Sequence, residues 1–112
     1  MKNKISILGQ DYKIIVDTSG NNPKLNDATG YMEPWAKKIV IDGSIDKNDS
    51  RQVENLDAYV RKVYRHEVMH AFFQESGLIY KFSAADEELL VDWIAIQYPK
   101  IKKIFAEMGI ED

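Results

Sequence analysis

The feature that most restricts the fold is a helical stripe over residues 55–76 that contains histidine and glutamate among apolar side chains. Its members recur every three or four residues, which is the spacing of one face of an amphipathic helix. The stripe consists of Leu56, Tyr59, Val60, Val63, Glu67, His70, Ala71 and Gln74. Such a face must be covered by another layer of the protein, and the ionisable groups within it must be compensated there.

The segment His66-Glu67-Val68-Met69-His70 places two imidazoles four residues apart. On a helix these rings lie one above the other and can bind one metal ion. Glu67 lies about 100° around the helix, where a general base could reach a water beside the same ion. The alternative is a pair of hydrogen-bonded core histidines with Glu67 solvated. We favour the metal site because a divalent cation compensates these groups.

The third protein ligand has to be a carboxylate, because His66 and His70 are the only histidines and the chain has no cysteine. A second helix is predicted to begin after Ser83, a residue typical of helix N-caps. Glu88 and Asp92 are four apart on this helix and share one face. We predict that Glu88 is the third ligand and that Asp92 orients a metal-binding histidine.

Two other acidic residues open the same helix. We interpret Asp86 and Glu87 as first-turn residues that interact favourably with the positive end of the helix dipole. Glu87 remains an alternative to Glu88 as the metal ligand.

The combination of His66-Glu67-x-x-His70 on one helix with Glu88-x-x-x-Asp92 on the next resembles the gluzincin zinc metallopeptidases. In size and layout, residues 30–95 are most similar to the minimal bacterial and phage-encoded forms, the ImmA/IrrE-type and SprT-like metallopeptidase domains. The resemblance implies a minimal zincin-like fold, a zinc cofactor and hydrolysis of peptide bonds in a protein or peptide substrate. It also implies a sheet edge strand beside the site, for which residues 35–42 are the candidate.

The chain departs from this family pattern in two ways. Glu87 replaces the usual Asn before the ligand Glu, and no third His is available to stabilise the oxyanion of the tetrahedral intermediate. Four tyrosines are candidates for that role, and the sequence ranks none of them: Tyr31, Tyr64, Tyr80 and Tyr98. The alternative function is therefore a catalytically silent, zinc-stabilised binding or adaptor module.

The remaining pattern predicts strands first and helices afterwards, in one α+β domain over residues 1–112 with a small antiparallel or mixed sheet. Residues 4–16 are predicted to form a hairpin around Gly9-Gln10, and residues 30–33 and 38–41 a further strand pair. Residues 39–42 are the predicted substrate-binding edge. Residues 18–27 are predicted to be a plain loop, and residues 46–50 a polar break before the first helix.

Tyr98-Pro99 is predicted to end the second helix, with a separate short helix following up to Gly109. The apolar residues of that segment are interpreted as core. Its three lysines, Lys100, Lys102 and Lys103, are interpreted as a solvated face.

Charge and hydropathy exclude some classes of function. With 15 basic and 18 acidic residues, the formal net charge of -3 gives no general attraction to phosphate backbones, so nucleic acid is not an expected partner. No apolar run has the length of a membrane span, and the N-terminus lacks a signal-peptide pattern. We expect a cytoplasmic protein without a membrane partner. The oligomeric state is left open.

Overall fold

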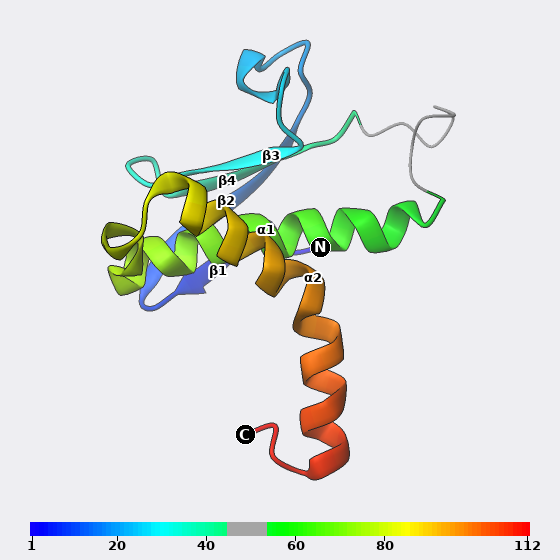
Figure 1. The fold of residues 1–112 in the computed structure, drawn as a ribbon. Helices are drawn as coiled ribbons and strands as arrows, with labels where there is room; N and C mark the ends of the chain where they lie inside the picture. The colour runs from blue at the N-terminus through cyan, green and yellow to red at the C-terminus, as the bar shows by residue number, and fades with distance from the viewer. Residues whose placement is uncertain (45–53) are drawn as a thin grey trace.

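The computed structural model describes residues 1–44 and 54–112, which form an α+β fold with a four-stranded mixed sheet and two long helices (Figure 1). The elements are β1 (Lys4–Ile7), β2 (Gln10–Asp17), η1 (Pro23–Leu25), β3 (Gly30–Glu33), β4 (Lys38–Asp42), α1 (Leu56–Ser76), η2 (Leu78–Lys81) and α2 (Ala84–Met108). The predicted polar break at residues 46–50 lies outside the described residues.

The sheet has the strand order β1-β2-β4-β3. β1 and β3 run antiparallel to their neighbours, whereas β2 and β4 are parallel. The predicted N-terminal hairpin is confirmed, but its turn consists of Leu8 and Gly9, because Gln10 already belongs to β2. Both turn residues have positive φ angles, 49° and 87°, as in the tight turns that match the twist of a hairpin.

The prediction that residues 35–42, and 39–42 in particular, form the edge of the sheet is wrong. β4 lies between β2 and β3, and its residues Ile39, Val40 and Ile41 are at most 2 % exposed. Three consecutive apolar residues are typical of a strand covered on both faces rather than of an edge. In the sheet of the described residues, the outer strand next to β4 is β3.

α1 covers one face of the sheet, as the stripe predicts (Figure 1). The helix begins after Asn55, whose side chain accepts a hydrogen bond from the Ala58 N–H, and ends at Gly77 in the left-handed conformation. The core between helix and sheet consists of Ile7, Tyr12, Ile39, Ile41, Val63 and Ala71. Full burial of one aliphatic side chain such as Ile39 or Val63 contributes about 1.5–3 kcal/mol to the free energy of folding.

α2 begins at the predicted N-cap Ser83, but the predicted break at Tyr98-Pro99 is wrong. The helix continues through Pro99 to Met108 and changes direction along its length (Figure 1). Proline has no N–H to donate to the carbonyl four residues before it, which is that of Ala95. The Arg65 Nε of α1 donates to this oxygen at 2.8 Å and so replaces the missing helix bond. None of the helices in the described part of the chain is long and apolar enough to cross a membrane.

A hydrogen-bonded cluster joins the end of α1 to the sheet. Tyr12 Oη and Lys37 Nζ each donate to Glu75 Oε1 at 2.6 Å. The hydrogen bond from Lys37, followed by that from Tyr12, lowers the pKa of Glu75 below its ordinary value of 4.5. Folding therefore favours the ionised carboxylate.

This cluster predicts an acid-dependent loss of stability. Because the folded state holds the pKa of Glu75 low, its contribution is complete above pH about 4.5 and disappears as the pH falls through the lower folded value. Glu75→Gln should be less stable than the wild type at pH 7, and the difference should shrink toward pH 3. Urea unfolding across this pH range measures it, with the exposed Glu111→Gln as the control. A difference that stays constant with pH would contradict the assignment.

Candidate metal centre

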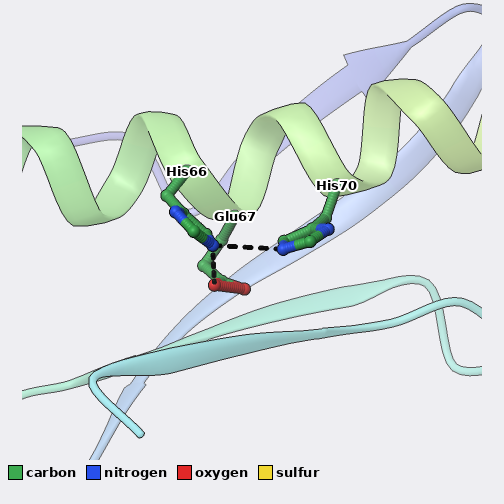
Figure 2. A group of neighbouring side chains, drawn as sticks. All are labelled: His66, Glu67 and His70. Atoms are coloured by element: carbon green, nitrogen blue, oxygen red, sulfur yellow. Dashed lines mark hydrogen bonds and ion pairs between the residues drawn. The ribbon is translucent and has the colours of Figure 1, made fainter. Parts of the chain in front are cut away.

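Three side chains of α1, those of His66, Glu67 and His70, project toward the sheet (Figure 2). The Nε2 atoms of His66 and His70 are 3.1 Å apart, and the Glu67 Oε1 lies 3.9 Å from the His66 Nε2. One ligand atom of each residue lies within 4.8 Å of the others, so this group could hold a metal ion. The one-turn separation of the two histidines produces this convergence.

Glu88 reaches the same point from α2. Its Oε1 lies 2.6 Å from the Nε2 of His66, and its Oε2 lies 3.0 Å from the Nε2 of His70. The structure therefore brings together the two histidines and the carboxylate that the sequence singled out as ligands. The helix start at Ser83 sets the turn of α2 on which Glu88 lies.

The second ring nitrogen of each histidine also has a carboxylate partner. The His66 Nδ1 lies 2.9 Å from Asp92 Oδ1, as predicted, and the His70 Nδ1 lies 2.7 Å from Glu87 Oε1. The interpretation of Glu87 as only a first-turn acidic residue is thus incomplete. The position of Glu87 four residues before Val91 puts it on the buried row of α2, and this spacing was the signal in the sequence.

The two histidines and the carboxylates around them offer more hydrogen-bond acceptors than there are N–H groups to donate to them. A neutral imidazole has one N–H, and an ionised carboxylate only accepts. If each Nδ1 donates to Asp92 or Glu87, both Nε2 atoms present lone pairs to each other and to Glu88. Lone pairs that converge in this way repel unless a cation lies between them. The donor set of two imidazoles and one carboxylate fits zinc.

Glu67 is 6 % exposed, and its Oε2 is buried without a hydrogen-bond partner in the described part of the chain. Burial raises the pKa of this carboxyl, although His70 and His66 oppose the shift. The close approach of β3 produces the burial, since a Cβ on Gly30 would lie 3.2 Å from the Glu67 Cγ and 2.8 Å from the Val40 oxygen. Only glycine allows strand and helix to approach so closely here.

Asp92 also contacts Lys62, which lies one turn before His66 on α1. Lys62 Nζ lies 2.5 Å from the same Asp92 Oδ1 that contacts His66. The hydrogen bond from Lys62 lowers the pKa of Asp92, and the bond from His66 acts in the same direction. Asp92 therefore stays ionised and holds the His66 ring in one orientation.

Two cavities border the site. One, of about 680 Å³, is lined by residues 27–30 and by side chains of α1 and α2 that include Lys62 and Asp92. The other, of about 470 Å³, includes His70 and Glu87. Gly30, Glu67 and Glu88 line both. Residues 18–27, predicted to be a plain loop, contain η1 and end at the first cavity.

None of the four candidate tyrosines forms a hydrogen bond with a histidine in the described part of the chain. Tyr31 lines the cavity that includes His70 and Glu87, and its hydroxyl accepts a hydrogen bond from the Asn22 amide at 2.7 Å. The Tyr80 hydroxyl accepts a bond from Gln74. The other two, Tyr64 and Tyr98, line a separate apolar cavity.

Comparison with known proteins returns no match for this chain among family models, curated proteins or solved structures. Its function therefore has to be argued from the site itself.

Proposed function

We propose that this protein is a zinc-dependent hydrolase of peptide bonds, with His66, His70 and Glu88 as the metal ligands and Glu67 as the general base. The observation that carries the proposal is the convergence of both Nε2 atoms and the Glu88 carboxylate within 2.6–3.1 Å. These three residues leave one position of a tetrahedral zinc site open, as catalytic zinc sites do. The proposed fold is that of a minimal zincin.

The charges around the site support a divalent cation. Four carboxylates, those of Glu67, Glu87, Glu88 and Asp92, surround the histidines. Among residues 1–44 and 54–112, Lys62 is the one ammonium group that is paired with them. So many like charges destabilise one another at these distances. A bound zinc ion supplies Lewis acidity, which polarises a carbonyl group and lowers the pKa of water toward about 7.

Glu67 has the properties of a general base. Its Oε2 has no competing hydrogen bond, and burial raises its pKa, which makes the carboxylate more basic. It accepts a proton from the attacking water and later transfers this proton to the amine that leaves. His66 and His70 keep fixed orientations throughout, because Asp92 and Glu87 hold their Nδ1 atoms.

β3 is the strand that would bind an extended peptide. It is the outer strand beside β4, and its first residue, Gly30, lines both cavities of the site. Main-chain groups on an outer strand can pair with an added peptide strand. The proposed peptide-binding edge is therefore β3, in place of residues 39–42.

The alternative, a zinc-stabilised binding or adaptor module, is favoured by one observation. Stabilisation of an oxyanion is often the largest single contribution to acyl transfer. Tyr31 lines a cavity of the site, but its hydroxyl already accepts a hydrogen bond from Asn22. Tyr80 is hydrogen-bonded to Gln74, and the other two candidate tyrosines line a separate cavity. A metal that only fastens α1 to α2 would need no such group.

Metal content and cleavage together decide between the two functions. The purified protein, loaded with zinc and freed of excess metal, is incubated with an unstructured polypeptide. One zinc per chain, with cleavage that a chelator stops and added zinc restores, supports the hydrolase. One zinc without cleavage supports the adaptor, and no bound zinc overturns both.

Glu87 gives a test of how the histidines are held. Glu87→Ala removes the acceptor for the His70 Nδ1 and should weaken zinc binding by about 10- to 100-fold, whereas Glu87→Gln keeps an acceptor and should weaken it less. Competition with a chromogenic chelator measures both affinities. Asp86→Ala, an exposed change on the same turn, is the matched control. Equal affinities in all three variants would remove Glu87 from the site.

A further inference from the structure

The two cavities that border the candidate metal centre are lined by different kinds of side chain. The smaller, which we call the Met32 cavity, has a volume of about 470 Å³. Outside the residues of the metal site, its lining is largely apolar and includes Met32, Pro34, Ile79 and Ala84. The larger, which we call the Asp27 cavity, has a volume of about 680 Å³, and four carboxylates and one ammonium group line it. The two cavities therefore suit different side chains of a bound peptide.

The main-chain hydrogen bonds of β3 determine which of its residues can pair with an added strand. The Asp42 N–H of β4 donates to the Thr29 carbonyl at 2.9 Å, so the main-chain groups of Thr29 face β4. In an antiparallel pair, the main-chain groups of successive residues face the partner strand and the open side in turn. Gly30 and Met32 therefore present their N–H and C=O groups to the outer edge. A peptide strand would pair with these two residues.

The peptide residues that pair with Gly30 and Met32 direct their side chains toward the site. Met32 packs against the core between the sheet and α1, and a Cβ on Gly30 would lie 3.2 Å from the Glu67 Cγ. Both positions are thus on the face toward which His66, Glu67 and His70 project (Figure 2). Residues directly opposite each other on neighbouring strands share a face. The two peptide side chains lie two residues apart, because the residue between them faces away.

The direction of the peptide decides which side chain enters which cavity. We take the antiparallel direction, in which β3 already pairs with β4, because antiparallel pairing is the more stable per residue. The peptide residue beside Met32 then comes first, and the residue beside Gly30 follows two positions later. The first side chain enters the Met32 cavity. The second enters the Asp27 cavity, which residues 27–30 line.

The charges of the Asp27 cavity favour a basic side chain. Its carboxylates are those of Asp27, Glu67, Glu88 and Asp92. The ammonium group of Lys62 is paired with Asp92 at 2.5 Å, which leaves the other three carboxylates in excess. Asp27 is exposed, so a guanidinium or ammonium group of a substrate can reach it. An acidic side chain at the same place would meet like charges.

We propose that the substrate is an extended peptide in which a large apolar residue is followed, two positions later, by Lys or Arg. Met32 and Ile79 select the apolar side chain, and Asp27 selects the basic one. Hydrolysis of one of the two bonds between these residues consumes one water and leaves a new carboxyl group and a new amino group. This preference rests on the proposed function and names its substrate class.

Peptide binding tests the preference without cleavage. Labelled decapeptides with Leu-Ala-Arg at the centre of a Gly/Ser sequence are titrated with zinc-loaded Glu67→Gln, and their fluorescence anisotropy is measured. Leu-Ala-Arg should bind about tenfold more tightly than Ser-Ala-Arg and about fivefold more tightly than Leu-Ala-Glu. The reversed peptide Arg-Ala-Leu should bind as weakly as these two. The same series with metal-free wild type shows whether the order is independent of zinc.

Exchange of the selecting residues should reverse the preference. Ile79→Asp should bind Lys-Ala-Arg more tightly than Leu-Ala-Arg, whereas Leu78→Asp, on the same turn but outside the cavity lining, should not. Ile79→Trp fills the cavity and should prefer Ala-Ala-Arg, which gives a second variant if Ile79→Asp does not fold. Asp27→Lys should prefer Leu-Ala-Glu, and Glu111→Lys, the same charge change far along the chain, should keep the wild-type order.

The outcomes separate this preference from the proposed hydrolysis. Equal binding of all the peptides, or cleavage by the wild type without regard to the two side chains, overturns the preference and leaves the hydrolase intact. Tightest binding of Arg-Ala-Leu overturns the antiparallel direction. Selective binding of Leu-Ala-Arg without cleavage by the zinc-loaded wild type supports the two side-chain sites and rejects the hydrolase.

Discussion

Replacement of Glu67 by Gln should lower peptide hydrolysis by about 10²- to 10⁴-fold while leaving one zinc per chain. The amide has nearly the same shape as the carboxyl group but cannot accept the proton of the attacking water. The variant should be no less stable than the wild type, because the buried Oε2 has no hydrogen-bond partner in the described part of the chain. Turnover, metal content and urea unfolding are measured on the same preparation.

The control for this experiment is Glu54→Gln, the same chemical change at an exposed position before α1. It should keep full activity. Undiminished hydrolysis by Glu67→Gln would show that Glu67 is not the base. Loss of zinc from that variant would instead show that Glu67 binds the metal directly.

Replacement of Glu88 by Ala should remove the zinc. Of the carboxylates in the described residues, only that of Glu88 contacts the Nε2 atoms of both His66 and His70 within 3.0 Å, so its loss leaves two ligands. At a free zinc concentration 100 to 1,000 times the dissociation constant, binding should stabilise the wild type by about 2.7–4.1 kcal/mol. Glu88→Ala should lose most of this stabilisation. Thermal unfolding with and without zinc measures the difference.

The same experiment separates a ligand from a structural role. The Glu88 side chain is 58 % exposed, so without metal the variant should unfold near the wild-type temperature. Asp86→Ala is the matched control and should keep the full zinc response. Retention of zinc by Glu88→Ala would reject Glu88 as the ligand and leave Glu87 as the candidate.

Much of the candidate site could be predicted from the sequence because its parts are local. The spacing of His66 and His70 places both rings on one face of any helix, and the structure keeps this helix. Ser83 starts α2 by a bond within its own first turn. The structure then places Glu88 and Asp92 beside the histidines. The N-terminal hairpin is equally local, since its strands are joined by a two-residue turn.

The errors concern contacts between residues distant in sequence. Glu87 contacts His70, which is 17 residues away in the sequence. Arg65 donates a hydrogen bond to the carbonyl of Ala95, 30 residues away, and this bond allows α2 to continue through Pro99. Neither contact can be deduced from residue spacing within one helix.

The sequence by itself thus determined α1, the start of α2, the strand segments and the histidine pair, because short-range spacing and capping specify them. Only the tertiary structure decided that β4 lies inside the sheet, that β3 borders the site and that Glu87 contacts a histidine. These features depend on which surfaces pack together, and packing sums interactions over the whole chain. The half of α2 that follows Pro99 illustrates the same point: its apolar residues were interpreted as core, and only the fold shows that Ile104, Phe105 and Met108 are exposed.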